Sequence, residues 1–189
     1  GTGGTLRFAM TINGAGGEQR INAPSALTPG VWHHVAVTLN GNIGVLYLNG
    51  NPVATNTSIT LRPWNMGATP NNYLGRSQYS DPYLNGAFNE FRIYSVALSR
   101  NEIAASYAMG PGRVFSDDSP LIAFTPGASS ITLSWPLEAT SFRLQSRTNL
   151  TQGAWMNVAS PVPQLVNGQW QVTVPVQSSG EAMFYRLTK

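Results

Sequence analysis

Short runs of alternating apolar and polar residues, separated by Asn-Gly pairs, constrain the fold of this chain more than any other feature. Asn-Gly pairs stand at residues 40–41, 49–50 and 167–168, and the first two enclose an apolar run at 43–48. Asn and Gly tolerate the positive φ values that two-residue hairpin loops require. The pairs therefore predict antiparallel hairpins, and the first two predict a three-stranded meander.

The same period-two alternation predicts further strands. Before residue 100 we expect strands at 6–12, 32–39, 43–48, 52–54, 73–76 and 86–94. Beyond residue 130 we expect strands at 131–135, 142–146, 155–158, 170–176 and 184–187. Closely spaced short strands of this kind are typical of a small antiparallel sandwich.

The composition agrees with an all-β fold. Charged residues make up 10% of the chain, against roughly 25% in average soluble domains, whereas the turn formers Gly (19) and Pro (13) are abundant. The hydrophobic share of 42% is sufficient for a buried core and excludes disorder as the overall state. We therefore predict an all-β, antiparallel sandwich fold.

One short helix is predicted after these first strands. Ser99 and Glu102 have the spacing of a capping box, in which each side chain bonds the backbone amide of the other residue. The Gly-Pro pair at 110–111 supplies the stop signal. We expect the helix to pack against a sheet through a stripe of Ile103, Ala104 and Tyr107.

The chain is expected to contain two domains. Residues 110–120 combine Gly, Pro and Ser with an Asp pair, which is typical of a linker. We predict a first domain at 1–110, a linker at 111–126 and a second, small β-sandwich module at 127–189.

Five segments of the first domain resemble, in the right order, the successive signatures of laminin-G-like, concanavalin A-like jelly rolls from secreted bacterial proteins. They are Trp32–Val37, Gly44–Gly50, Tyr73–Ser77, Leu84–Tyr94, and Ala97–Ser99 with Glu102–Ile103. The tail is similar to small β-sandwich modules that end secreted polysaccharide-active enzymes, through Phe142–Ser146, Trp155 and Phe184–Leu187. The resemblance implies a jelly roll followed by a second sandwich, in a secreted protein.

Two departures from that family are visible. Family members carry several strands before the point at which Leu6 begins here, so the resemblance implies the C-terminal half of a jelly roll. Because an incomplete sheet exposes unpaired backbone groups, we expect a companion chain or an upstream part of the protein to supply the missing strands. Asn89 stands where relatives commonly have Asp, so a feature that depends on this Asp is not carried over.

The loop-rich segment between Trp64 and Tyr83 is the best candidate for a binding site. Sugars present apolar C–H faces and many hydroxyls, so their sites combine aromatic rings with amides, carboxylates and Arg. The candidate ligand-binding residues are Trp64, Asn71, Asn72, Arg76, Gln78, Tyr79, Asp81 and Tyr83. The alternative is that Trp64 and Tyr73 belong to the core and that the Asn residues only form turns.

The sequence gives little support for a catalytic site or a metal site. The eight acids, among them Asp117 and Glu181, lack the closely spaced Glu/Asp pattern that hydrolases resembling this fold carry on one strand, so we predict no catalytic residues. His33 and His34 are adjacent on a predicted strand and point to opposite faces, so they cannot chelate one ion together. We predict no cofactor, and a calcium ion at Asp81 stays open on the support of a single acid.

Charge and hydropathy exclude two further classes of partner. The net charge of +3 comes from arginines scattered along the chain, without a basic stripe, so we predict no nucleic-acid partner. No apolar run approaches the roughly 20 residues that cross a bilayer, so we predict no membrane span.

The function expected from these features is non-catalytic carbohydrate binding. The resemblance implies an accessory region of a secreted bacterial polysaccharide-active protein, in particular a glycoside hydrolase. One alternative is a structural packing or extracellular assembly module that binds no sugar. Another is a part of a glycosidase whose catalytic residues lie outside this chain.

Overall fold

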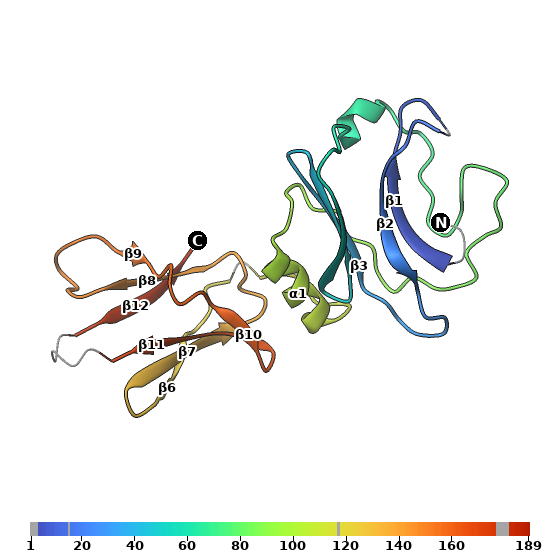
Figure 1. Ribbon diagram of the computed structural model, residues 1–189. Helices are drawn as coiled ribbons and strands as arrows, with labels where there is room; N and C mark the ends of the chain where they lie inside the picture. Colours follow the sequence, from blue (N-terminus) through green and yellow to red (C-terminus); the bar gives the residue numbers. More distant parts are fainter. Residues whose placement is uncertain (1–3, 15, 117, 177–181) are drawn as a thin grey trace. The chain divides into compact units, whose positions relative to one another are not determined.

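Short antiparallel strands make up most of the regular structure of this protein in a computed structural model (Figure 1). The structure describes residues 4–14, 16–116, 118–176 and 182–189. In these ranges the strands form several antiparallel sheets, accompanied by one α-helix. The predicted all-β sandwich fold is therefore confirmed. The chain separates into two compact units, residues 1–103 and 104–189.

Two sheets form the strand structure described for the first unit. Strands β1 (Thr5–Met10) and β2 (Gln19–Ala26) pair as an antiparallel hairpin. The other sheet has the order β3-β4-β5, with β3 at Val35–Asn40, β4 at Ile43–Leu48 and β5 at Asn51–Asn56.

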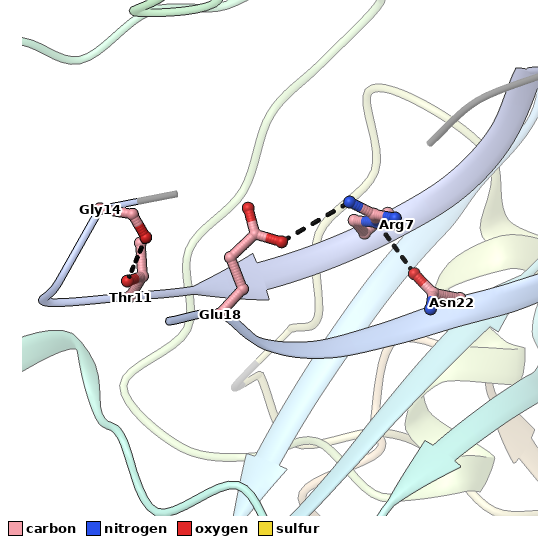
Figure 2. A network of polar contacts seen from close by, with 5 residues as sticks. All are labelled: Arg7, Thr11, Gly14, Glu18 and Asn22. Atoms are coloured by element: carbon pink, nitrogen blue, oxygen red, sulfur yellow. Dashed lines mark hydrogen bonds and ion pairs between the residues drawn. The ribbon is translucent and has the colours of Figure 1, made fainter. Parts of the chain in front are cut away.

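Polar side chains cross-link the β1–β2 hairpin (Figure 2). Arg7 Nε donates a hydrogen bond to Asn22 Oδ1 at 2.9 Å, and Arg7 Nη1 lies 3.5 Å from Glu18 Oε2. Beyond the end of β1, Thr11 Oγ1 donates to the carbonyl oxygen of Gly14 at 2.9 Å. The contact of Arg7 with Asn22 joins residues that are directly paired across the two strands, and so it supports this register.

The β3-β4-β5 meander confirms the hairpins predicted from the Asn-Gly pairs. Asn49 and Gly50 both have positive φ, 50° and 78°, as a tight hairpin loop between β4 and β5 requires. Asn49 Oδ1 also accepts a hydrogen bond from the amide of His34 at 3.0 Å. The turn residue therefore links its hairpin to the start of β3.

The apolar core of the first unit takes residues from both sheets. Ile21 of β2, Leu46 of β4 and Ile59 beyond β5 are at most 2% exposed. Phe8 of β1 and Val37 of β3 pack against this group. Leu46, Phe8 and Val37 belong to predicted strands, whereas Ile21 and Ile59 lie outside every strand that the sequence predicted.

The second unit has two sheets of its own in its described residues. Their orders are β10-β11-β7-β6 and β12-β8-β9. The strands are β6 (Ala123–Pro126), β7 (Ser130–Pro136), β8 (Arg143–Arg147), β9 (Met156–Asn157), β10 (Gln164–Val166), β11 (Gln169–Pro175) and β12 (Phe184–Thr188). Five of these match the predicted strands, whereas β6 and β10 were not predicted. Strand β6 lies within 111–126, the range predicted as a linker.

The core of the second unit also joins its two sheets. Trp135 of β7 and Trp170 of β11 are cross-strand partners and are nearly buried, as is Leu144 of β8 in the other sheet. Trp170 Nε1 donates to the carbonyl oxygen of Leu137 at 3.2 Å, so the buried indole nitrogen is satisfied.

The predicted helix is present as α1 (Arg100–Met109). Its capping box is formed: the Ser99 amide donates to Glu102 Oε2 at 2.6 Å, and the Glu102 amide donates to Ser99 Oγ at 3.3 Å. Gly110, with φ of 75°, follows the helix at its end. These predictions are confirmed.

The predicted apolar stripe of α1 is only partly correct. Ile103 is buried, but Tyr107 is 48% exposed, and Ala105 and Met109 are buried in the core of the second unit. Ala105 and Met109 are four residues apart and so share one side of the helix. Tyr107 lies midway between them in sequence and therefore points away from that side.

The strands predicted at 73–76 and 86–94 are wrong for this structure, because both segments have no regular secondary structure. A strand needs a neighbour for its backbone hydrogen bonds, and the two sheets described for this unit pair no strand with either segment. The apolar residues of the second segment remain at the surface, with Phe91 64% and Ile93 84% exposed.

Candidate functional site

The loop that follows β5 is anchored at its start by Gln19 of β2. Gln19 Oε1 accepts hydrogen bonds from the amides of Thr60 and Leu61 at 2.7 and 2.9 Å, and Gln19 Nε2 donates to Thr60 Oγ1 at 2.8 Å. Ile59, one residue earlier, is fully buried in the core. The polypeptide is therefore held against the sheets where the loop begins.

Arg62 fixes the next turn of the loop. Its Nη1 donates to the carbonyl oxygens of Ile59 and Leu61 at 2.9 and 2.8 Å. Its Nη2 donates to the carbonyl oxygen of Gly41 and to Asn42 Oδ1, in the turn between β3 and β4. The short 3₁₀-helix η2 (Pro63–Met66), which starts immediately afterwards, is thus tied to that turn.

Trp64 projects from this anchored 3₁₀-helix. Its side chain is 75% exposed, and Tyr73 further along the loop is 44% exposed. The alternative interpretation, that Trp64 and Tyr73 close the core, is therefore wrong. A large ring on a well-fixed turn is a suitable platform for the apolar face of a ligand.

A hollow lies further along the loop, where the chain folds back on itself. The amide of Leu84 donates to the carbonyl oxygen of Gly75 at 2.8 Å and closes the residues between them into a ring. Inside this ring the Tyr79 amide donates to Ser77 Oγ at 3.1 Å. The resulting open hollow has a volume of about 540 Å³ and is lined by Arg76, Gln78, Tyr79, Ser80, Asp81, Pro82 and Tyr83.

The hollow combines exposed rings with unused polar groups. Tyr79 and Tyr83 are 57% and 72% exposed. Within the described part of the chain, the side chains of Gln78 and Asp81 take part in no hydrogen bond or ion pair. The Arg76 guanidinium carbon lies 4.7 Å from the centre of the Tyr73 ring, a cation–π contact that orients its charge. Donors, acceptors and rings thus face the same open space.

The structure divides the predicted binding residues into two groups. Five of the eight line the hollow, namely Arg76, Gln78, Tyr79, Asp81 and Tyr83. Trp64, Asn71 and Asn72 lie on the same loop but do not line it, and Asn72 Nδ2 donates to the carbonyl oxygen of Thr69 at 2.9 Å. Sequence reasoning missed Ser80 and Pro82, whose position between the two tyrosines was the available signal.

Most of the carboxylates described in the first unit already have partners. Glu18 pairs with Arg7, Glu90 lies 2.7 Å from Arg92 Nη2, and Glu102 caps α1. Asp117 and Glu181 lie outside the described residues. Asp81 is therefore the carboxylate that the hollow offers to a ligand.

The two adjacent histidines lie immediately before β3. His33 Nε2 lies 3.0 Å from the carbonyl oxygen of Thr28. Burial lowers the pKa of His34 and nearby Arg92 lowers it further, while Glu90 acts in the opposite direction.

Among the described residues no three His, Cys, Asp or Glu side chains gather as a metal site would require. The helix in the described ranges is too short to cross a membrane.

A match to a known protein family covers the unit that carries the hollow. Residues 1–104 match a laminin G family model described as the concanavalin A-like lectin/glucanases superfamily. The chain is also similar to part of an S-layer domain-containing protein from Clostridium thermocellum, whose residues 221–444 are known from a 2.1 Å crystal structure. That match has 44% sequence identity and a TM-score of 0.38, and it covers 53% of this chain and 50% of that chain. The match thus spans about half the length of that solved structure. No curated protein matches the sequence significantly.

Proposed function

The chain belongs to the concanavalin A-like lectin/glucanases superfamily, and we propose that it binds carbohydrate without catalysing a reaction on it. The observation that carries this proposal is the open hollow, in which exposed Tyr79 and Tyr83 stand beside the unused amide of Gln78 and carboxylate of Asp81. Rings stack on the C–H faces of sugars, and amides and carboxylates bond their hydroxyls.

Binding is favoured over hydrolysis by the number of carboxylates in the hollow. Glycosidases use two carboxyl groups about 5 to 10 Å apart on either side of the scissile bond. The residues lining the hollow include one, Asp81. The second carboxyl group would therefore have to come from elsewhere, which agrees with a recognition role for the hollow itself.

Trp64, Asn71 and Asn72 are proposed to extend the binding surface along the same loop. The support is that Trp64 is 75% exposed on a turn held by Arg62. Its ring is therefore presented to solvent without a need for rearrangement, which favours binding because little conformational freedom is lost.

Calorimetric titration of the protein with neutral and acidic oligosaccharides from plant and algal polysaccharides tests the proposal. We expect dissociation constants between about 1 mM and 1 μM for at least one glycan. Tyr79→Ala and Tyr83→Ala should each weaken its binding by about tenfold, as expected for loss of a stacking ring.

Trp32→Ala is the matched control, because Trp32 is 67% exposed in the same unit but does not line the hollow. Its affinity should stay unchanged, and all variants should keep the wild-type melting temperature. A folded protein that binds no glycan of the panel would exclude the proposal, as would equal losses from Trp32→Ala and the two tyrosine variants.

The wider setting is proposed from the family resemblance of both units. The chain would act as an accessory region of a secreted bacterial polysaccharide-active protein, with a glycoside hydrolase domain upstream or in a companion chain. Mass spectrometry of culture medium for peptides of this chain, joined to or copurifying with such a domain, tests this arrangement. Recovery only from the cell interior would contradict it.

A second function, packing against another domain or chain, is favoured by the exposed apolar residues of 86–94. Phe88, Phe91 and Ile93 are 53%, 64% and 84% exposed in a segment with a strand-like sequence. The partner would supply strands that pair with this segment, since an apolar run of this kind exposed to water marks an interaction surface. Slower amide exchange at 86–94 in the presence of the domain or companion chain that copurifies with this protein would support packing, and unchanged exchange would contradict it.

A further inference from the structure

One side of the β12-β8-β9 sheet in the second unit carries arginines. Alternate residues of a strand share one side of a sheet, and paired residues on neighbouring strands lie on the same side. Leu144 of β8 and its partner Leu187 of β12 belong to the core side. The opposite side is made by Arg143, Gln145 and Arg147 of β8, Phe184, Arg186 and Thr188 of β12, and Asn157 of β9. Together with Trp155, these residues are the arginine face.

Trp155 organises two of the three arginines. The guanidinium carbon of Arg186 lies 4.4 Å from the centre of the Trp155 ring, and that of Arg147 lies 5.2 Å from it. Contacts of this kind hold a guanidinium over an aromatic ring and restrict its rotamers. The two guanidinium groups are therefore held in position in the absence of a ligand.

Hydrogen bonds to uncharged oxygen atoms also hold the guanidinium groups of Arg186 and Arg147 in position. Arg186 Nε and Nη2 both donate to Gln145 Oε1, at 3.0 and 2.9 Å, and Gln145 Nε2 donates to Asn157 Oδ1 at 2.9 Å. Arg147 Nη2 donates to the carbonyl oxygen of Gln152 at 2.7 Å. Because these acceptors carry no formal charge, the hydrogen bonds orient the guanidiniums and leave their positive charge uncompensated.

No described carboxylate pairs with the arginine face. The ion pairs found among the described residues involve Arg7, Arg92 and Arg113. The side chain of Arg143 makes no hydrogen bond or ion pair with a described residue, and Arg147 Nε is buried without a hydrogen-bond partner among them. Three positive charges without a described carboxylate partner therefore stand on one side of a small sheet.

The spacing of the charges indicates a polymeric anion. Arg143 and Arg147 are four residues apart on one strand, which places their Cα atoms about 13 Å apart, much further than one carboxylate or sulfate group extends. Guanidinium groups bind carboxylate and sulfate oxygens through paired N–H donors. A polymer that repeats such groups along its length can contact all three arginines.

The remaining chemistry favours a polysaccharide over a nucleic acid. Gln145 Oε1 and Asn157 Oδ1 are already engaged, and the amide nitrogen of Asn157 and the hydroxyl oxygen of Thr188 are left to bond sugar hydroxyls. Single-stranded nucleic acids stack their bases on open aromatic rings, whereas the Trp155 ring is engaged by two guanidiniums. We propose that the arginine face binds a carboxylated or sulfated polysaccharide. This proposal does not depend on the hollow in the first unit.

Affinity electrophoresis and calorimetry with dextran sulfate, polygalacturonate and neutral dextran test the proposal. We expect binding to one or both anionic polymers, a decrease in affinity with added salt through screening, and at least tenfold weaker binding to dextran. Comparison of the two anionic polymers identifies sulfate or carboxylate as the preferred group.

The variant Arg147→Gln/Arg186→Gln should weaken binding to the anionic polymer by at least tenfold. Its control is Arg20→Gln/Arg100→Gln, which removes the same charge from exposed arginines outside the arginine face. Arg143→Gln provides an independent test, because Arg143 has no described contact whose loss would disturb folding, and it should weaken binding about threefold or more.

Equal losses in the two double variants would overturn the proposal, because they would indicate attraction by net charge alone. Binding of duplex DNA as tight as that of the anionic polysaccharides would also overturn it. If Arg147→Gln/Arg186→Gln does not fold, unchanged binding by folded Arg143→Gln rejects the site. Affinity for a neutral oligosaccharide reports on the hollow and affinity for the anionic polymer reports on the arginine face, so failure of the one and failure of the other are distinguishable.

Discussion

Gly44 of β4 lies where two buried isoleucine side chains approach the backbone. A Cβ atom at this position would stand 2.6 Å from Ile59 Cδ1 and 2.8 Å from Ile21 Cδ1. Both isoleucines are at most 2% exposed, so neither has space to move away. The absence of a side chain at Gly44 is therefore a packing requirement of the core between the two sheets.

Gly44→Ala should lower the free energy of unfolding by about 1 to 3 kcal/mol, the usual effect of overpacking a core. Urea unfolding followed by circular dichroism measures the change. Gly86→Ala is the control, because its new Cβ would meet Leu84 Cγ at an ordinary 3.4 Å. If the two variants are equally stable, the close approach at Gly44 is not a constraint on the fold.

His34 makes the stability of the first unit depend on pH. Burial, assisted by Arg92 and opposed by Glu90, lowers its pKa from 6.5, so the folded state disfavours the protonated ring. Because the unfolded chain then binds the proton more readily, stability is fully present above pH 6.5 and declines as the pH falls toward the lower folded pKa.

The melting temperature of the protein should therefore decrease on acidification below pH 6.5, and His34→Gln should reduce this decrease. Differential scanning calorimetry at a series of pH values provides the measurement. His33→Gln is the matched control, because it removes an imidazole from the neighbouring position. An identical pH dependence in wild type and His34→Gln would assign the effect to other groups.

At the scale of elements, α1 depends on its capping box. The reciprocal bonds of Ser99 and Glu102 satisfy two amides at the helix start, and the helix buries Ile103, Ala105 and Met109. Ser99→Ala should lower stability by about 1 kcal/mol, as removal of an N-cap side chain usually does.

Thermal unfolding by far-ultraviolet circular dichroism tests the cap. Ser95→Ala, four residues earlier on an exposed bend, is the control and should leave the transition unchanged. If Ser99→Ala unfolds at the wild-type temperature, the capping bonds do not contribute to stability.

Residues 86–94 show the limit of pattern reasoning at this scale. Their alternation predicted a strand, yet they form none, because a strand requires a backbone partner as well as a pattern. The opposite error occurred at β6, where Ala123–Pro126 is exposed and lacks an apolar pattern but pairs with β7.

At the scale of the whole molecule, each compact unit has a core of its own. The core of the second unit includes Ala105 and Met109 of α1 in addition to residues of its two sheets. A fragment of residues 98–189 should therefore fold alone with one cooperative transition, whereas a fragment of 111–189 should lose about 2 kcal/mol or more of stability through the missing Met109 side chain.

Tryptophan fluorescence checks this prediction, because Trp135 and Trp170 are 3% and 6% exposed in the folded unit. Fragment 98–189 should show blue-shifted emission that moves to the red in one step with urea. Red-shifted emission without denaturant would show that this unit needs the first one in order to fold.

The sequence alone determined the features that depend on neighbouring residues. These are the Asn-Gly hairpins, the capping box of α1, most of the strands and the laminin-G-like, concanavalin A-like character of the first domain. It also indicated the loop that carries the candidate site, because Tyr, Gln, Asp and Arg cluster there in a segment predicted to be mostly loop.

Only the tertiary structure decided which of these residues meet. The backbone bond from Leu84 to Gly75 brings Tyr79, Asp81 and Tyr83 around one hollow and leaves Trp64 outside it. The arginine face likewise arises from the pairing of β8 with β12, which places Arg186 beside Gln145 although they are far apart in the chain. Such contacts depend on backbone pairing across long loops, and residue patterns along one segment carry no information about that pairing.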